Sequence, residues 1–272
     1  MRMTAAALLL LLLPLPAVAA SAGCGQSPPA APPETVEAAG ETREVLVAVP
    51  EDYDRDTPHR LVFGFHGRTT PAERVRRYYG LENAMAESAP TVFVYPTAAR
   101  QDDDTFIWRV PEDLALFDMV VERLSADYCI DRTRIFAVGH SLGASFVNTL
   151  GCLRGEALRG IASVAGGIHA RAEECRGDAA ALLLHNRADR LVDVDRGRRA
   201  RDVLVTANGL ESAPAAFYPR PFGCYRYGPA EAHDPVAWCL YAESVNRRGR
   251  FYPHLWPDGA EEAMAAFFSV LP

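Results

Sequence analysis

The segment Gly139-His140-Ser141-Leu142-Gly143 constrains the fold of this chain more than any other. An apolar run, 134–138, precedes it and an amphipathic run, 144–153, follows it. These runs predict a strand and a helix, so the serine lies at a sharp strand-to-helix turn. The backbone crowds together at such a turn, and a glycine two residues to either side of the serine makes room for it. The pattern therefore predicts a serine hydroxyl displayed at the edge of a sheet, beside a helix N-terminus.

The alternation of short apolar runs with amphipathic runs continues from about residue 44 to the C-terminus. It predicts an α/β fold with a mostly parallel, twisted sheet and helices on both faces. The predicted strands are 44–49, 60–65, 91–95, 134–138, 160–164 and 181–185, and the predicted helices are 71–87, 112–126, 144–153, 196–207 and 258–270. The aromatic stretch 219–250 is predicted as an insertion that covers one end of the sheet. No internal repeat or second linker is evident, so residues 43–272 are expected to form one domain.

The composition excludes several functional classes. The formal net charge is −7, so the chain offers no basic footprint for nucleic acid or for an anionic membrane surface. All 28 basic residues are arginine, which excludes chemistry that depends on lysine, such as Schiff bases and the phosphate-loop lysine. Three carboxylates at 102–104 lack the further ligands of a metal loop, and no thiolate or histidine pair has zinc spacing. We therefore expect a site that needs no metal and no cofactor.

The N-terminus has the pattern of a secretory signal, residues 1–23. A short cationic start precedes an apolar run too short to span a bilayer, and small residues follow to Ala22. Cleavage after an Ala-x-Ala-like site near Ala19 or Ala22 would release a secreted protein. Cleavage before Cys24, in a segment that resembles a bacterial lipoprotein box, would leave a lipid anchor on that cysteine. The stretch 24–42, rich in proline and alanine, is expected to be a disordered spacer.

Export permits disulfides among the six cysteines. If a lipid occupies Cys24, five cysteines remain and one thiol is left free. Cys224 and Cys239, separated by 15 residues across a stretch rich in Pro, Gly and Tyr, are expected to form a local disulfide. We expect Cys175 to be a buried cysteine with a free thiol.

A serine hydroxyl is a poor nucleophile at neutral pH, so Ser141 needs a base, and the base needs an orienting acid. In a fold of this kind the chain order is serine, then acid, then histidine. The apolar strand 181–185 is followed by Asp189, which we predict as the acid. Asp193 and Asp195 lie nearby and remain alternatives if the loop is longer.

Seven histidines compete for the role of base. Chain order disfavours those that precede the acid, which are His59, His66, His140, His169 and His185. His233 lies inside the predicted insertion, which favours a surface position. His254 directly precedes the last predicted helix, where the histidine loop belongs, so we predict it as the base.

Two backbone amides are needed to stabilise an oxyanion on the substrate. The amide of Leu142, the residue after the nucleophile, is predicted as the first. The segment Phe65-His66-Gly67-Arg68 ends an early apolar strand, and Gly67 permits an unusual turn there. The second predicted donor is the amide of Arg68, with Thr69 as the alternative.

From about Arg43 to Pro272 the chain resembles the secreted α/β-hydrolases grouped as feruloyl esterases and polyhydroxybutyrate depolymerases. The resemblance rests on the serine turn, on Asp189 and on the segments Phe63-Gly64-Phe65-His66-Gly67-Arg68, Tyr95-Pro96, 128–134, Gly151-Cys152, Val164-Ala165-Gly166-Gly167 and His254-Leu255-Trp256-Pro257. It implies an α/β-hydrolase fold and a disulfide near the nucleophile, at Cys129 and Cys152. The chain departs from the family pattern at Ala144, Asn186 and Pro253, where glycine is usual.

These features predict a secreted or lipid-anchored serine carboxylesterase, which we expect to be a monomer. Ser141 would attack the ester carbonyl, His254 would take its proton, and Asp189 would fix the imidazole tautomer. The resemblance implies hydroxycinnamoyl polysaccharides or hydroxyalkanoate polyesters as substrates, with feruloyl esters favoured. Trp108 and Trp256 are predicted to contact the substrate, and Trp238 is a further candidate for an aromatic wall.

Three other functions fit parts of the same pattern. An acyltransferase or thioesterase would use the same triad with a different acceptor or leaving group, and a peptidase would share the acyl chemistry. A surface binding protein on an inactive hydrolase scaffold is the alternative from a different class, and the departures at Asn186 and Pro253 motivate it.

Overall fold

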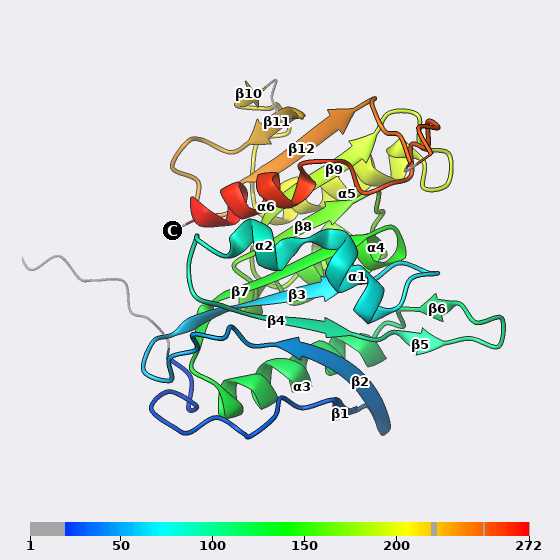
Figure 1. Cartoon of the computed structure of the whole chain (residues 1–272). Helices are drawn as coiled ribbons and strands as arrows, with labels where there is room; N and C mark the ends of the chain where they lie inside the picture. Colours follow the sequence, from blue (N-terminus) through cyan, green and yellow to red (C-terminus); the bar gives the residue numbers. More distant parts are fainter. Residues whose placement is uncertain (1–19, 219–221, 247, 272) are drawn as a thin grey trace, which may run out of the picture.

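The computed structural model describes residues 20–218, 222–246 and 248–271, and a sheet of ten strands runs through them (Figure 1). The strands are β1 (Thr35–Ala38), β2 (Glu41–Ala48), β3 (His59–Phe65), β4 (Thr91–Pro96), β7 (Ile130–His140), β8 (Gly160–Val164), β9 (Ala180–Asn186), β10 (Ala216–Tyr218), β11 (Gly223–Tyr227) and β12 (Val236–Tyr241). Their order across the sheet is β1-β2-β4-β3-β7-β8-β9-β12-β11-β10. The central strands from β4 to β12 run parallel, and the strands at each edge pair antiparallel. The predicted mostly parallel sheet is confirmed.

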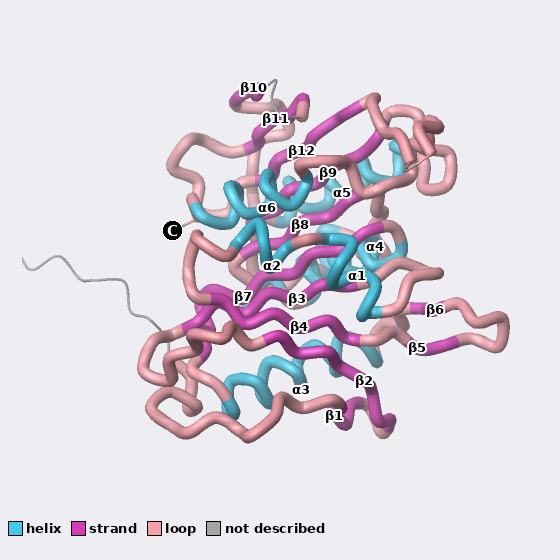
Figure 2. Tube along the Cα trace, in the orientation of Figure 1, coloured by secondary structure: helices cyan, strands magenta, loops and turns pink. Residues whose placement is uncertain are grey.

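Helices cover both faces of this sheet (Figures 1 and 2). On one face pack α1 (Ala72–Tyr79), α2 (Leu81–Met85) and α6 (Ala260–Ser269), and on the other α3 (Glu112–Asp127), α4 (Leu142–Leu153) and α5 (Val194–Ala207). In β3, Phe63 and Phe65 belong to the core on the α3 side, whereas Val62 belongs to the core on the α1 side. Because both faces are covered, the middle residues of the parallel strands are buried and mostly apolar. No helix in the described residues combines the length and apolar character needed to cross a bilayer.

Residues 24–42, predicted as a disordered spacer, carry regular structure instead. β1 and the start of β2 fall within this range and pair with one another. Just before it, the amide of Ser21 donates to the Ile130 carbonyl at 2.9 Å, and the Ser21 hydroxyl donates to the Tyr128 carbonyl at 2.8 Å. The proline and alanine content does not predict this ordered structure, because the contacts that hold the segment come from residues far away in the sequence. Residues 1–19, with most of the predicted signal, lie outside the described residues.

Three disulfides fix parts of the chain, Cys24–Cys129, Cys152–Cys175 and Cys224–Cys239. The last was predicted, and it bridges the neighbouring strands β11 and β12. The prediction of a free Cys175 is wrong, and Cys129 and Cys152 do not pair with each other, because sequence alone does not fix connectivity. The sulfur of Cys24 is bonded to Cys129, so it cannot also carry a thioether-linked lipid.

Two predicted elements differ in detail from those in the structure. The helix predicted at 71–87 divides at Gly80, whose φ of 63° ends α1 in the left-handed conformation that glycine adopts at little cost. The stretch 219–250, predicted to cover the end of the sheet, contains β11 and β12 and widens the sheet, since β12 pairs parallel to β9. Residues 219–221 and 247 of this stretch lie outside the described residues. A short hairpin of β5 (Ala99–Arg100) and β6 (Phe106–Ile107) stands apart from the main sheet.

Candidate active site

Ser141 lies at the junction between β7 and α4, where the backbone is strained. Its φ of 58° and ψ of −119° are a conformation that non-glycine residues rarely adopt. A Cβ at Gly139 would lie 2.6 Å from the Gly143 carbonyl, and a Cβ at Gly143 would overlap the Phe65 carbonyl oxygen. Both flanking glycines are therefore needed for the close packing of this turn. As predicted, the serine is displayed at the carboxyl end of a central strand.

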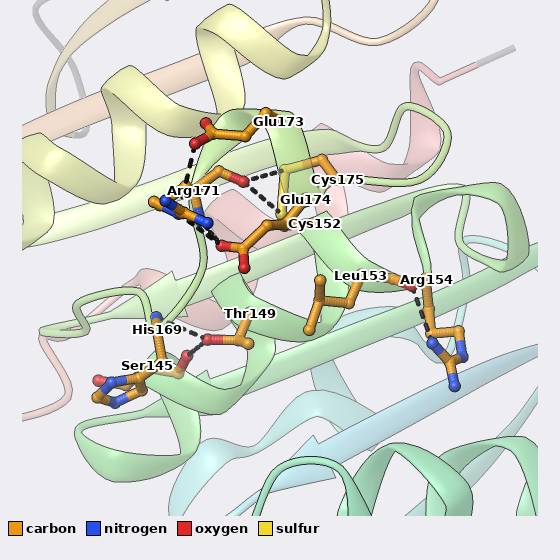
Figure 3. The surroundings of a disulfide bond; sticks show 10 residues. All are labelled: Ser145, Thr149, Cys152, Leu153, Arg154, His169, Arg171, Glu173, Glu174 and Cys175. Atoms are coloured by element: carbon orange, nitrogen blue, oxygen red, sulfur yellow. Dashed lines mark hydrogen bonds and ion pairs between the residues drawn. A yellow bond between two sulfur atoms is a disulfide. The ribbon is translucent and has the colours of Figure 1, made fainter.

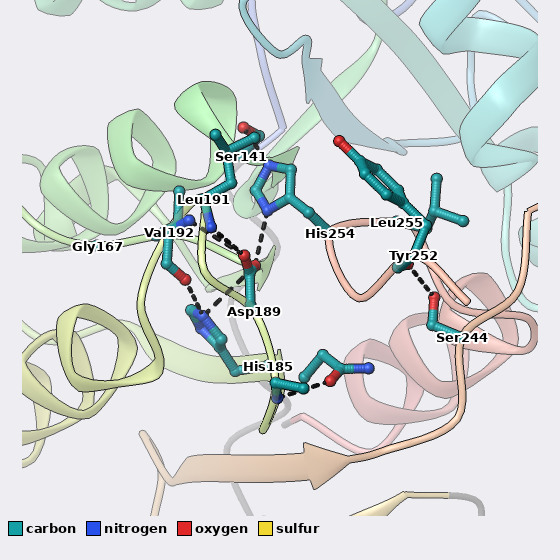
Figure 4. Close-up of polar contacts among 12 residues, drawn as sticks. Ser141, Gly167, His185, Asp189, Leu191, Val192, Ser244, Tyr252, His254 and Leu255 are labelled. Carbon is teal, nitrogen blue, oxygen red and sulfur yellow. Dashed lines mark hydrogen bonds and ion pairs between the residues drawn. The ribbon is translucent and has the colours of Figure 1, made fainter. Parts of the chain in front are cut away.

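Ser141, His254 and Asp189 form one continuous chain of hydrogen bonds (Figure 4). His254 Nε2 lies 2.8 Å from Ser141 Oγ, and His254 Nδ1 lies 2.7 Å from Asp189 Oδ2. With the proton on Nδ1, the imidazole donates to the carboxylate and accepts from the serine hydroxyl. The fold brings together side chains that lie 113 and 65 residues apart in sequence.

The Asp189 carboxylate is buried and held from two sides. Its Oδ1 accepts from the amides of Leu191 at 2.9 Å and Val192 at 3.1 Å, which leaves Oδ2 for the imidazole. Burial raises the pKa of Asp189, but the hydrogen bond and charge of His254, with the two amides, outweigh it and lower the pKa below its usual range. The carboxylate is therefore ionised at neutral pH, as an orienting acid must be.

The alternative acids do not reach the imidazole. Asp193 is the N-cap of α5, and its side chain accepts from the Asp195 amide at 2.9 Å. Asp195 lies in the first turn of that helix, where it pairs with Arg198. The turn between β9 and Asp189 is tight, because the side-chain oxygen of Asn186 accepts a hydrogen bond from the Ala188 amide at 2.9 Å. Asparagine thus makes this turn at a position where the family usually has glycine.

His185, predicted only as the end of a strand, packs behind the acid. It is buried, its Nε2 donates to the Val192 carbonyl at 2.8 Å, and the same nitrogen lies 3.8 Å from Asp189 Oδ2. Burial lowers the pKa of His185, so the ring is neutral. The ring fits because a Cβ at Gly197 would overlap His185 Nδ1. Sequence reasoning missed this contact, because His185 and Gly197 are brought together only by the packing of α5 on β9.

The other histidines near the site do not compete with His254. The ring of His140 lies 5.1 Å from that of His254, and burial lowers its pKa to about 3, which keeps it neutral. His233 is exposed and pairs with the neighbouring Asp234. The loop that carries His254 is fixed by the Ser244 hydroxyl, which donates to the Tyr252 carbonyl at 2.8 Å.

The two amides predicted for the oxyanion site border the same cleft as Ser141. Among the described residues, the amides of Leu142 and Arg68 have no hydrogen-bond acceptor. The loop of Arg68 is shaped by buried His66, whose Nε2 accepts from the Ala98 amide at 2.9 Å and whose Nδ1 donates to the Gly67 carbonyl at 2.8 Å. A Cβ at Gly67 would lie 3.5 Å from the Cβ of Ser141, so this loop passes close to the serine.

The expectation for Trp108 is not met. It is buried, its indole nitrogen donates to the His66 carbonyl at 2.9 Å, and its ring packs against Phe65 and Phe146, away from the cleft. Trp108 holds the loop after β3 in place. The sequence alone could not distinguish this structural role from a contact with the substrate. Trp256 does line the cleft, where its ring stacks on Tyr79 with centroids 4.2 Å apart. Trp238 is a buried core residue of β12.

The segment between β8 and η2 (Ala172–Glu174) lines the cleft through His169. Figure 3 shows His169 beside Thr149 of α4. The His169 amide donates to the Thr149 hydroxyl at 3.0 Å, and Thr149 in turn donates to the Ser145 carbonyl on α4. The disulfide Cys152–Cys175 ties the far end of this segment to the same helix. The helix that begins at the nucleophile therefore also positions a wall of the site.

No protein-family profile matches the chain, but curated proteins do. Feruloyl esterase D of Neurospora crassa is 30% identical over 245 residues, which cover 82% of this chain and 81% of that protein. The chain belongs to the feruloyl esterase family. A probable feruloyl esterase C of Aspergillus niger is 29% identical over 199 residues, covering 70% of each chain. These relatives support an esterase function for this family member, a hydrolase of the carboxylesterase type.

Solved structures show that this esterase has the α/β-hydrolase fold. An acetyl xylan esterase from Aspergillus awamori superposes with a TM-score of 0.65 at 12% identity, covering 83% of this chain and 94% of that one. A ferulic acid esterase from Anaeromyces mucronatus, solved with ferulic acid, superposes with a TM-score of 0.59 at 14% identity, covering 87% and 88%. The fold predicted from the resemblance is confirmed.

Proposed function

We propose that this family member hydrolyses hydroxycinnamoyl esters through a covalent acyl-enzyme on Ser141. The observation that carries the proposal is the unbroken contact from Ser141 Oγ through His254 to Asp189, with distances of 2.8 and 2.7 Å. A serine, an imidazole and a carboxylate in this order are the parts that acyl transfer requires. The same contact argues against an inactive binding protein, because the departures at Asn186 and Pro253 leave it intact.

In the acylation step, Ser141 Oγ attacks the ester carbonyl while His254 Nε2 accepts the hydroxyl proton. Negative charge then develops on the carbonyl oxygen, and the amides of Leu142 and Arg68 donate hydrogen bonds to it. Asp189 stabilises the imidazolium through Nδ1. The protonated His254 passes its proton to the leaving alcohol, and the acyl group remains on Ser141.

In the second step, His254 accepts a proton from water, and the resulting nucleophile attacks the acyl-enzyme carbonyl. The acid is released and Ser141 recovers its proton from His254. The protein groups proposed to act in both steps are Ser141, His254 and Asp189, with the amides of Leu142 and Arg68.

The rim of the cleft supports an aromatic acyl group. Leu191, Val245 and Tyr252 border the cleft and are 69%, 63% and 44% exposed, so these large apolar side chains lie open to solvent beside the catalytic serine. Exposed apolar side chains at a concave site favour a ligand with an apolar face. A hydroxycinnamoyl group, as in the named substrates of the relatives, supplies such a face.

Secretion remains part of this proposal. Three disulfides fit an oxidising compartment, since cytosolic thiols are kept reduced. We further propose that residues 43–272 form the catalytic domain as predicted, acting as a monomer, with the preceding strand and disulfide as its N-terminal support.

A panel of chromogenic esters tests the proposed function. We expect hydrolysis of feruloyl esters with a kcat/KM at least about tenfold above that for short alkanoate esters. Contact with the aromatic acyl group needs to stabilise the transition state by only about 1.4 kcal/mol to give that ratio. Burst release of the alcohol before steady state would report the acyl-enzyme. A preference for hydroxyalkanoate oligomers would instead assign a polyesterase, and faster transfer to an added alcohol than to water would assign an acyltransferase.

A further inference from the structure

The cleft above Ser141 is positively charged, although the whole chain carries a net charge of −7. Five arginines line it, Arg68, Arg74, Arg77, Arg196 and Arg248, against two acidic residues, Asp258 and Glu261, and one of the five, Arg68, pairs with Asp103 at 3.5 Å. Glu261 already accepts a hydrogen bond from the Trp256 indole at 2.8 Å. The local excess of positive charge therefore does not follow from composition. A cleft lined by one sign of charge concentrates ligands of the opposite sign.

Two of these arginines share one face of α1. Arg74 and Arg77 are three residues apart, which places them side by side along the helix, and both are exposed. Neither side chain has a partner among the described residues. Arg76, on the same helix but outside the cleft, is neutralised by Glu82 through two hydrogen bonds of 2.7 Å. On α1, then, the arginine that does not line the cleft is paired and those that line it are not.

The sheet order places α1 and the apolar rim on opposite sides of the serine. The loop from β3 to α1 lies on one side of β7, which carries Ser141, whereas β9 and β12 lie on the other. Leu191 and Val245 follow those last two strands. If the apolar rim holds the acyl group, the α1 side faces the alcohol part of the ester.

We propose that the alcohol part of the substrate is a negatively charged sugar polymer, one whose carboxylates bind Arg74 and Arg77. This inference rests on the proposed function, and it names the substrate class of the same site. The planar guanidinium matches the geometry of a carboxylate, and a ligand carboxylate supplies a partner that the described residues do not provide for these side chains.

A matched pair of substrates tests this proposal. One is a feruloylated oligosaccharide that carries a uronic acid, and the other is the same compound with that carboxylate reduced to an alcohol. We expect the KM for the acidic ester to be about three- to tenfold lower at low salt, because a few exposed arginine–carboxylate pairs contribute modestly. The ratio of the KM for the reduced ester to the KM for the acidic ester should approach one in about 0.5 M NaCl, because salt screens the interaction between exposed charges.

The variant Arg74→Gln/Arg77→Gln should reduce the ratio of the two KM values to within about twofold of one. The matched control is Arg176→Gln/Arg199→Gln, which removes the same charge from exposed positions outside the cleft and should keep the ratio. Binding of both esters to the Ser141→Ala protein measures the preference without hydrolysis. Equal KM or equal binding for the two esters would overturn the proposal. Preferential binding with no hydrolysis by the natural protein would support it and contradict the proposed function instead.

The segment from Ala20 to Cys24 is held against the start of β7 by contacts independent of the cleft. Ser21 is buried, and its hydroxyl both donates to the Tyr128 carbonyl and accepts from the Ile130 amide at 2.9 Å. Ala20 forms a bridge with Asp131, and a Cβ at Gly23 would overlap the backbone of Tyr128. Residues 20–24 therefore dock against the start of β7 through one isolated bridge and a following turn, and the disulfide Cys24–Cys129 closes this contact.

From these contacts we infer that hydrolysis of the Ala19–Ala20 peptide bond releases the mature protein, and that Cys24 is not lipidated. Ala17 and Ala19 provide the small residues that such a cleavage needs. Cleavage after Ala22 or before Cys24 would remove the buried Ser21, and a lipid on Cys24 would use the sulfur that bonds Cys129.

The test is to express the full chain in a bacterium that secretes it and to determine the N-terminal sequence and intact mass. We expect a chain that begins at Ala20, with the mass of three disulfides and no lipid. Any other N-terminus, whether Met1, Gly23 or a lipid-bearing Cys24, would overturn the inference. The Cys24→Ser variant cannot be lipidated and should begin at the same residue.

Discussion

Replacement of the nucleophile, Ser141→Ala, is expected to lower kcat for feruloyl ester hydrolysis by about three to six orders of magnitude. The variant keeps the amides of Leu142 and Arg68 but has no hydroxyl for His254 to deprotonate, so no acyl-enzyme forms. Residual hydrolysis would come from water held near the oxyanion site. Steady-state kinetics, together with labelling by a fluorophosphonate probe, would measure the loss.

Folding should survive this change. Within the part of the chain that the structure describes, the Ser141 side chain hydrogen-bonds only to His254, and the alanine inherits the backbone conformation that the serine already adopts. We expect the free energy of unfolding in urea to stay within about 1 kcal/mol of the natural protein. Ser269→Ala, at the end of α6, is a matched control that removes a hydroxyl far from the site and should keep full activity. Activity of Ser141→Ala near that of this control would contradict the assignment of the nucleophile.

Replacement of the acid, Asp189→Asn, is expected to lower kcat by about three to four orders of magnitude. Oδ1 accepts from the amides of Leu191 and Val192, so the oxygen of an asparagine must occupy that position. Its NH₂ group then points at His254 Nδ1, which can only accept from it. The proton moves to Nε2, and the imidazole can no longer take the Ser141 proton. Kinetics measured against pH would show the loss at neutral pH.

Asp193→Asn provides the matched control, because Asp193 is the nearby alternative that sequence reasoning left open. Asparagine caps a helix about as well as aspartate, so the contact with the Asp195 amide should persist. We expect its kcat to stay within about twofold of the natural protein. If Asp193→Asn lost activity while Asp189→Asn retained it, the acid would have to be reassigned.

Local patterns predicted most of the fold. β8 was predicted residue for residue at 160–164, and the strands that became β3, β4 and β9 were located to within a residue or so at each end, because buried parallel strands are continuous apolar runs. β7 extends further at both ends than its apolar part, because Ile130 pairs with His59 of β3 and His140 pairs with Val164 of β8, and hydropathy does not register such pairing. The long helix at 71–87 was divided by Gly80, whose left-handed conformation depends on how α1 and α2 pack.

Features that depend on distant contacts could not be predicted in this way. Residues 24–42 have the composition of a linker, yet β1 and β2 pair there and the disulfide Cys24–Cys129 ties the segment to β7. Trp108 was expected in the cleft and lies in the core, because an aromatic residue after a strand suits either place. The support of Asp189 by His185, and the arginines gathered around Ser141, follow from packing between elements far apart in the chain.

The sequence alone determined the types of group in the site and the order in which the chain presents them. A serine between two glycines, an acid after a late strand and a histidine before the last helix follow from local backbone geometry, which nearby residues dictate. Only the tertiary structure decided which carboxylate meets the imidazole, which cysteines pair and what charge surrounds the serine. Those outcomes depend on distances between residues far apart in the chain, and such distances are set when the sheet and its helices pack together.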